Sequence, residues 1–263
     1  MGKRSDFVGP AASCRLRDKE GTTMQSNEAR LEQLRQHLNC GEGQSQEAID
    51  DITASLESDR EILRPKDKKE PLPLFTDKGM PTGSKAPRWI CHVLGLRHRC
   101  AHILLLWRSP ALGDLLLLQI RDWAKDDSAG HLDITVGGHM TADDRESQDT
   151  AFAEMLQELS LRPSDLEGGL ESIGGYAHDE SRPHESFYNS EWRDVYVGCL
   201  SGEAIARVRF PDGEVAGIVL IPAGDAGRLL KQSALPIASA LRCSLPRCLK
   251  WLGLHQRHLP PVP

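Results

Sequence analysis

The stretch from Gly137 to Leu161 constrains the fold of this chain more than any other. A glycine pair is followed by an acidic loop and then by apolar residues at the spacing of one helical face, namely Phe152, Met155, Leu156 and Leu159. Glu154 and Glu158 lie one turn apart, roughly opposite that face. The pattern therefore predicts a strand end, a glycine turn and an amphipathic helix with two neighbouring carboxylates.

Two carboxylates side by side next to a glycine loop suit a divalent cation, because such ions prefer oxygen ligands. An ordinary amphipathic helix with an acidic solvated face has the same spacing, and periodicity alone favours that interpretation.

The same stretch resembles the Nudix box, the motif of the Nudix hydrolase superfamily. The family pattern is Gly, five residues, Glu, seven residues, then Arg-Glu-aliphatic-any-Glu-Glu-any-Gly-aliphatic, and it is matched by Gly138, Glu154, Met155, Glu158 and Leu161. Three positions differ: Ala153 replaces Arg, Gln157 replaces the first Glu of the pair, and Ser160 replaces Gly. The interval from Gly138 to Ala153 is one residue longer than the pattern, so Asp144 or Glu146 would serve as the early acid.

Residues from about 74 to 231 resemble the superfamily branch related to isopentenyl-diphosphate isomerase. The similar segments, in order, are Phe75-Thr76-Asp77 with Pro81-Thr82-Gly83, Cys91-His92, Leu96 to Arg99, Leu116 to Arg121, Gly137 to His139, Tyr188 to Val197 and Asp212 to Gly217. The resemblance implies a Nudix-type α/β/α sandwich with a mixed sheet. Interleaved strands and one strong helix independently indicate an α/β fold.

The resemblance also implies a magnesium site, with Mn²⁺ as an alternative ion. Its ligands would be Glu154, Glu158, the Gly138 carbonyl, Gln157 as a neutral oxygen donor, and Glu146. Glu154 and Glu158 would be catalytic, and Glu214 is the candidate general base, although a solvated loop acid is an equal alternative.

The expected reaction is hydrolysis of a diphosphate bond in a nucleoside-diphosphate-like small molecule, because cations overcome the repulsion between a diphosphate and its nucleophile. Arg121 and Lys125 follow a strand end and could contact phosphates, or be ordinary surface charges. Trp192 could stack on a ring of the substrate, or belong to the core and rim. The competing class is a Nudix domain that has become a ligand-binding or interaction module.

Three histidines, His92, His98 and His139, resemble the metal-binding histidines of the isomerase, with Glu191 near one of its acids. Such a site would suit a transition metal. Hydrogen-bonded structural histidines near strand ends are the other interpretation. The isomerase has its catalytic cysteine where this chain has Gly137, so isomerase activity is not expected.

The formal net charge of −6 argues against a broad nucleic-acid surface, so no nucleic-acid partner is expected. No run of about 20 apolar residues exists, which predicts a soluble protein without a membrane span. An odd count of seven cysteines, none at zinc-knuckle spacing, fits reduced thiols and a cytoplasmic protein. An organellar presequence is disfavoured by the early acids, and translation could start at Met1 or Met24.

Four segments are expected: a disordered N-terminus over 1–25, a helical extension and linker over 26–70, the Nudix domain over 71–240, and a C-terminal tail over 241–263 without functional signal. In the extension, Ser26 and Ser45 would each begin a helix, the second ending at Pro65. This helical pair could mediate a homodimer or be an appendage. Within the domain, Ser172 to Leu200 should form a hairpin, Val215 to Ile221 a strand and Asp225 to Leu230 a helix.

Overall fold

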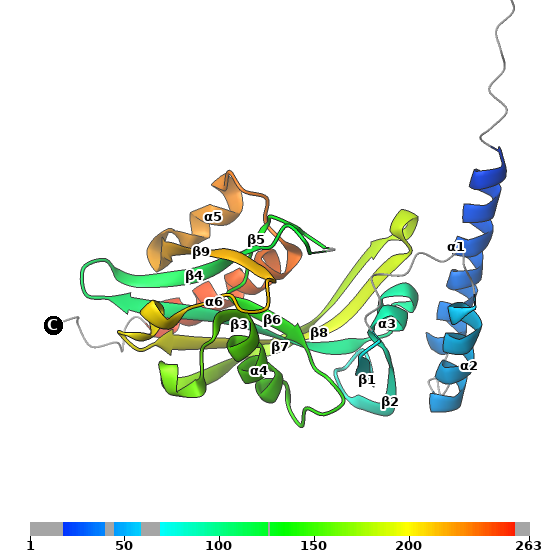
Figure 1. The fold of residues 1–263 in the computed structure, drawn as a ribbon, viewed down its shortest axis with the longest axis horizontal. Coiled ribbons are helices and arrows are strands. Elements are labelled where there is room, and N and C mark those ends of the chain that lie inside the picture. Colours follow the sequence, from blue (N-terminus) through cyan, green and yellow to red (C-terminus); the bar gives the residue numbers. More distant parts are fainter. Residues whose placement is uncertain (1–17, 40–44, 59–68, 126, 256–263) are drawn as a thin grey trace, which may run out of the picture.

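A mixed sheet of nine strands forms the centre of the molecule, with helices on both sides (Figure 1). The computed structural model describes residues 18–39, 45–58, 69–125 and 127–255. The helices are α1 (Asp18–Asn39), α2 (Gln46–Glu57), α3 (Arg88–Leu94), α4 (Ser147–Leu159), α5 (Ala226–Gln232) and α6 (Ser239–His255). The strands are β1 (Pro71–Phe75), β2 (Pro81–Pro87), β3 (His98–Ser109), β4 (Gly113–Arg121), β5 (Leu132–Asp133), β6 (Val136–His139), β7 (Leu166–Arg182), β8 (Phe187–Leu200) and β9 (Val215–Pro222).

Strand β3 is the hub of the sheet. It pairs antiparallel with β1, β4 and β6 and parallel with β8. Residues from Ala101 to Leu106 are buried without interruption. Because both faces of β3 are covered, its sequence is a continuous apolar run rather than an alternating one. The strand predicted for Ala101 to Trp107 is thereby confirmed.

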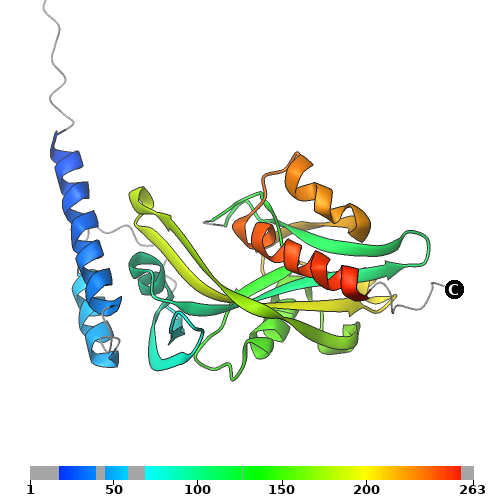
Figure 2. The same cartoon turned by 180° about the vertical axis from the view of Figure 1, so that it is seen from behind.

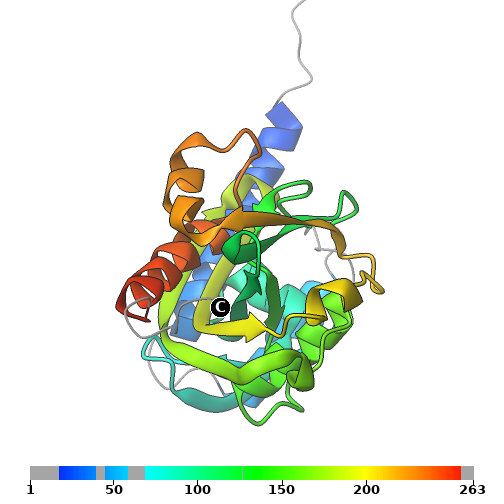
Figure 3. The same ribbon diagram turned by 90° about the vertical axis from the view of Figure 1, so that its left-hand side faces the viewer.

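Helix α4 covers one face of the sheet and α6 crosses the other, as the view from behind and the end-on view show (Figures 2 and 3). Ala151, Met155 and Leu159 of α4 share a buried cluster with alternate β3 residues, Ala101 among them. On the opposite face, Leu104 of β3 packs in the cluster that contains α6. The predicted α/β class, a mixed sheet between helices, is confirmed.

Helix α6 differs from the expected C-terminal tail. Its residues Leu241, Leu245, Cys248 and Leu252 recur at the spacing of one helical face and are buried against the sheet. The expected domain boundary at residue 240 falls inside α6 and would cut this core helix away from the sheet that it covers. Helix α6 therefore belongs to the domain and not to a tail. The tail beyond 255 lies outside the described residues.

Helices α1 and α2 stand at one side of the sheet (Figure 1). Leu31 and Leu38 of α1, with Ile49 and Leu56 of α2, are buried in one cluster with α3. Ser45 caps α2 as predicted, because its Oγ accepts a hydrogen bond of 3.3 Å from the Ala48 N–H. Helix α1 begins at Asp18, inside the segment expected to be disordered, and residues 1–17 and 59–68 lie outside the described residues.

Helix α3 lies in a region expected to be rich in strands. Gly95 ends it with a φ of 64°, the left-handed conformation that favours glycine. The short helix places His92 above the start of β3. The hairpin expected for 172–200 is confirmed by β7 and β8, and the later strand and helix by β9 and α5.

Among the described residues, no helix has both the length and the apolar character needed to cross a membrane. The described cysteines, Cys91, Cys100, Cys199, Cys243 and Cys248, are all free thiols. Cys14 and Cys40 lie outside the described residues.

Candidate active site

A cavity of about 880 Å³ opens where the glycine turn of β6 meets α3, α4 and the β7–β8 hairpin. Two sets of residues with ligating groups lie at this cavity, and all of their members except Glu158 and His98 line it. The helix-borne group consists of Glu154, Gln157 and Glu158 of α4 with Gly138 and Glu214. The strand-borne group consists of His98, Cys100, His139 and Glu191.

Gly138 and Glu154 are in direct contact. A Cβ atom at position 138 would lie 2.0 Å from Glu154 Oε1, so only glycine leaves room for this carboxylate beside the β6 backbone. Glu158 follows one helical turn later and is buried, with Gln119 Nε2 donating to its Oε2 at 3.4 Å. The structure thus brings Gly138 and Glu154 together and places Glu158 one helical turn along α4, and the role of these residues as metal ligands stays a prediction.

Burial sets the protonation of these carboxylates. It raises the pKa of Glu154 to about 7, with the charge of Glu214 acting in the same direction. Burial, followed by the charge of Glu154, also raises the pKa of Glu158 well above its usual range. Two anions side by side in a poorly solvated place repel each other, and a bound cation would relieve that repulsion.

Cationic side chains from the end of β4 line the same cavity. Arg121 Nη1 contacts Asp133 Oδ2 at 3.1 Å, and its Nε and Nη2 donate to the Asp127 carbonyl at 3.1 and 3.0 Å. Lys125 forms an ion pair with Glu214 across the cavity mouth. The arrangement keeps a guanidinium, an ammonium and a carboxylate close to the helix-borne group.

Glu146 is placed elsewhere. It is the N-cap of α4, where its side chain forms a capping box with Asp149, and it is exposed. Glu154 lies eight positions further along the chain, about 12 Å along the helix axis. Asp144, the other early acid, accepts hydrogen bonds from Thr141 in the loop and from Thr150 of α4.

Trp192 does not line the cavity. Successive residues of a strand point to opposite faces, so Glu191 and Arg193 of β8 border the cavity while Trp192 faces away. Its indole packs over Gly79, and its Nε1 donates to Asp194 Oδ1 at 3.1 Å.

The strand-borne group is assembled from three neighbouring strands. His98 and Cys100 are two residues apart on β3, His139 of β6 is the register partner of Cys100, and Glu191 of β8 is that of His98. One donor atom from each of the four lies within 4.8 Å of the others. The imidazole of His92 is adjacent, with its ring centroid 5.2 Å from that of His98 and 5.5 Å from that of His139.

Burial lowers the pKa of His92, His98 and His139, so all three are neutral at pH 7. Burial acts to raise the pKa of Glu191, but the charge of Arg193 and the contact with His139 outweigh it, so the pKa lies well below the usual range. Arg193 Nε donates to Glu191 Oε2 at 2.6 Å, while Oε1 lies 3.9 and 3.6 Å from the Nε2 atoms of His98 and His139.

The resemblance singled out the three histidines and Glu191, with metal binding and a structural role as alternatives, but Cys100 was missed. Its signal was the two-residue spacing from His98 within a strand, which places both side chains on one face. Scattered cysteines gave no reason to single it out.

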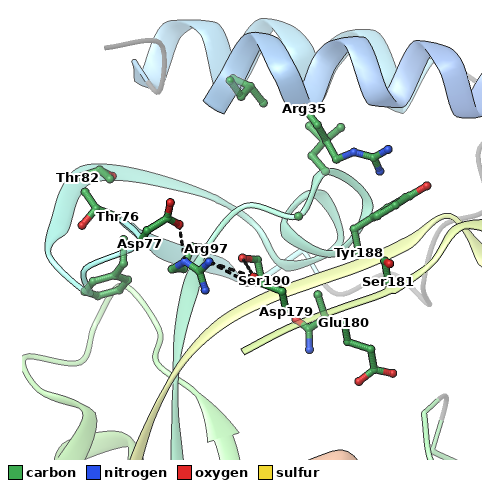
Figure 4. A pocket seen from close by; sticks show the side chains of 15 residues that line it. Arg35, Thr76, Asp77, Thr82, Arg97, Asp179, Glu180, Ser181, Tyr188 and Ser190 are labelled. Atoms are coloured by element: carbon green, nitrogen blue, oxygen red, sulfur yellow. Dashed lines mark hydrogen bonds and ion pairs between the residues drawn. The ribbon is translucent and has the colours of Figure 1, made fainter. Parts of the chain in front are cut away.

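A second cavity, of about 770 Å³, lies between α1 and the β7–β8 hairpin (Figure 4). Each charged group that lines it has an ion-pair partner, either within the lining or on a neighbouring residue. Arg97 contacts Asp77 and Asp179, each at 3.0 Å, and the Arg35 guanidinium lies 3.4 Å above the Tyr188 ring. These contacts join the helical extension to the hairpin, and no cluster of ligating groups remains for chemistry among the residues that line this cavity.

No family model matches the chain. Over 156 residues it is 32% identical to Nudix hydrolase 3 of Arabidopsis thaliana, a match that covers 59% of this chain and 19% of that protein. The chain thus spans about a fifth of the length of this relative.

Solved structures similar to this chain include DR0079 of Deinococcus radiodurans, with a TM-score of 0.49 and 16% identity, covering 68% of this chain and 99% of that one. The Nudix domain of Shewanella oneidensis NrtR, complexed with ADP ribose, has a TM-score of 0.45 and 12% identity over 59% of this chain and 87% of that one. A mutT/nudix family protein of Listeria innocua has a TM-score of 0.44 and 17% identity, and the match covers 61% of this chain and 97% of that one.

Proposed function

We propose that this chain, which is homologous to a Nudix hydrolase, is a Mg²⁺-dependent enzyme that hydrolyses the diphosphate bond of a nucleoside-diphosphate-like small molecule. The observation that carries the proposal is the half-buried Glu154, which lies against Gly138 and lines a cavity of about 880 Å³, with the buried Glu158 one helical turn later. Raised pKa values for both carboxylates are typical of a group arranged for a cation or for proton transfer.

The donor set fits Mg²⁺. The ligands that we propose are the carboxylates of Glu154 and Glu158, the Gly138 carbonyl and the amide oxygen of Gln157, all hard oxygen donors, and Mn²⁺ would also suit them. When bound, the cation neutralises phosphate oxygens and lowers the pKa of water. The capping position of Glu146 does not favour its inclusion.

The remaining chemistry belongs to the residues around the cavity. Arg121 and Lys125 would hold the substrate's phosphates, since charge-assisted hydrogen bonds from these groups are strong. Glu214 would accept a proton from the attacking water, and its ion pair with Lys125 fixes its place at the cavity mouth.

The departures from the Nudix box have structural consequences. Gln157 leaves the site with one negative charge fewer, which predicts a weaker affinity for Mg²⁺. Ala153 is exposed and cannot orient a carboxylate, but the contact with Gly138 and the hydrogen bond from Gln119 constrain Glu154 and Glu158 instead. Ser160 has a φ of 57°, the left-handed conformation that explains a glycine in the family pattern.

The test is release of phosphorylated product from a panel of nucleoside and sugar diphosphates with Mg²⁺ or Mn²⁺. We expect turnover by the wild type and a loss of about 100-fold or more in Glu158→Gln, because a metal ion contributes several kcal/mol to the transition state. Glu167→Gln, an exposed acid on β7 outside the cavity, is the matched control. Arg121→Ala should raise the KM about tenfold while the protein stays folded.

No turnover on any compound, together with no metal-dependent change in Tm, would reject the enzyme and leave the alternative of a catalytically impaired ligand-binding or interaction module. Isopentenyl-diphosphate isomerisation is the least favoured alternative, because Gly137 provides no thiol. A homodimer through α1 and α2 and a cytoplasmic location stay predictions.

A further inference from the structure

We infer that the tip of the β7–β8 hairpin binds the heterocyclic base of a nucleotide, with Phe187 as the stacking ring and Asn189 as the group that hydrogen-bonds the edge of the base. The inference deepens the proposed function, because it names the part of the substrate that lies beyond the diphosphate. It rests on that function for the diphosphate alone, since a base can bind without any turnover.

The alternation of side chains along β8 places Phe187 and Asn189 on one face. They are two residues apart, and both line the cavity of about 880 Å³. Tyr188, between them, faces α1, where the Arg35 guanidinium lies 3.4 Å above its ring (Figure 4). Glu180, the register partner of Asn189 on β7, points away from α1 in the same view. The helical extension therefore covers the Tyr188 face of the hairpin, and the other face borders the cavity of the candidate active site.

Phe187 contributes a half-buried aromatic ring to the cavity wall. The Arg182 guanidinium lies 4.1 Å from the centroid of this ring, and the His92 ring meets it edge-on at 5.3 Å. Aromatic rings and guanidinium planes both stack on nucleic-acid bases, because every base has an aromatic face. The pair of Phe187 and Arg182 therefore supplies the stacking surface that was expected at Trp192.

Asn189 provides the polar group that a base requires. Its Oδ1 atom is buried and has no hydrogen-bond partner among the described residues. A side-chain amide carries an acceptor and two donors side by side, which match the neighbouring donor and acceptor on the edge of a base. A buried acceptor without a partner is unfavourable, and a bound base would satisfy it.

Asp127 connects the hairpin tip to the cationic side of the cavity. Its Oδ1 accepts a hydrogen bond of 2.9 Å from Arg182 Nη2, and its carbonyl accepts hydrogen bonds of 3.1 and 3.0 Å from Arg121. Arg121 is the proposed phosphate contact, so a single residue bridges it to the guanidinium over Phe187. The base and the phosphates of one nucleotide thus have binding groups within the same cavity.

The experiment compares the binding of AMP, GMP, CMP and UMP with that of ribose 5-phosphate, which has the sugar and the phosphate but no base. In calorimetric titrations of the purified full chain, we expect at least one nucleotide to bind about tenfold or more tightly than ribose 5-phosphate. Phe187→Ala and Asn189→Leu should each weaken nucleotide binding about tenfold and leave ribose 5-phosphate unchanged. Phe210→Ala, which alters an exposed ring outside the cavity lining, is the matched control.

Phe187→Tyr keeps an aromatic ring and should keep the nucleotide affinity. Equal affinities of the wild type for all five compounds would overturn the inference, even if the variants fail to fold. Nucleotide binding by Phe187→Ala that equals that of the wild type would also overturn it.

The base and the hydrolysis are tested separately. Base-dependent binding by a chain that hydrolyses no compound would reject the proposed hydrolysis and support the base site. Turnover of nucleoside and sugar diphosphates with equal kcat/KM would support the hydrolysis and overturn the base site.

Discussion

Members of the helix-borne and strand-borne groups line the same cavity, yet the two groups are built on different secondary structure. Glu154 and Glu158 lie four residues apart on α4, so one helical turn sets their spacing. The strand-borne donors come from three strands, where the alternation of side chains and the register of the sheet set the spacing. The α4 members of the first group can be identified along one segment of the sequence, whereas the second group exists only once distant strands pair.

The same burial has opposite effects in the two groups. It raises the pKa of Glu154 and Glu158 and lowers the pKa of the histidines, because in both cases the charged form loses solvation. Both changes favour neutral groups in the absence of an ion. The comparison teaches that one cavity can be lined by oxygen atoms from one element and by nitrogen and sulfur atoms from others.

The largest effect is expected from a substitution that disrupts the helix-borne group alone. In Gly138→Ala the new Cβ would lie 2.0 Å from Glu154 Oε1, so the carboxylate must leave the β6 backbone. We expect kcat/KM to fall about 100-fold, which corresponds to about 2.7 kcal/mol. Steady-state kinetics measure the loss, and Gly217→Ala, where nothing lies within 4 Å of a new Cβ, is the control. Equal losses in both variants would show that the contact with Glu154 is not the cause.

The negative charge of the helix-borne group can be increased without altering the strands. Gln157→Glu restores a carboxylate at the cavity edge, and an added anion strengthens the attraction for a divalent ion. We expect the Mg²⁺ concentration for half-maximal activity to fall about tenfold, measured by titration at constant ionic strength. Gln148→Glu, on the same helix but outside the cavity lining, should leave that concentration unchanged. An unchanged Mg²⁺ requirement in Gln157→Glu would argue against position 157 as a ligand.

The opposite pKa changes predict opposite pH dependences of stability in metal-free protein. The raised pKa of Glu154 contributes stability that is present below its usual pKa of 4.5 and is lost as pH rises to about 7. The lowered histidine pKa values contribute stability that is present above 6.5 and is lost as pH falls below it.

Comparing wild type with Glu154→Gln cancels the histidine contribution. Between pH 4.5 and 7 the wild type should lose Tm relative to the variant by several degrees, since the full change is about 3 kcal/mol at most. Thermal melts in a chelator measure this difference. A difference in Tm that does not vary with pH would show that Glu154 ionises normally, and excess Mg²⁺ should remove the decline in the wild type.

The smallest effect is expected for Trp192, which faces away from both groups. Trp192→Phe removes the hydrogen bond to Asp194 and should cost about 1 kcal/mol of unfolding free energy. The KM should change less than about twofold, because the side chain does not line the cavity. Denaturant unfolding measures the change in stability, and steady-state kinetics on the same sample measure the KM. A KM raised tenfold would show that Trp192 contacts the substrate.

Local patterns determined a large part of this protein from the sequence alone. The helical spacing of α4, the apolar run of β3 and the Ser45 cap depend on neighbours in the chain, so the helix, the strand and the cap were predictable. The spacing of Glu154 and Glu158 followed from the same helix. The pattern of α6 was equally local, but its place in the core became clear only from its contacts with the sheet.

Only the tertiary structure decided which side chains share the cavity. Cys100 and Glu191 are far apart in sequence and meet because β8 lies parallel to β3, while Trp192, one residue later, is turned to the other face. Likewise, Glu146 is near Glu154 in sequence but is used as a helix cap. The physical reason is that strand register and burial are set by pairing and packing between distant segments, and these also set the pKa values on which the chemistry of the cavity depends.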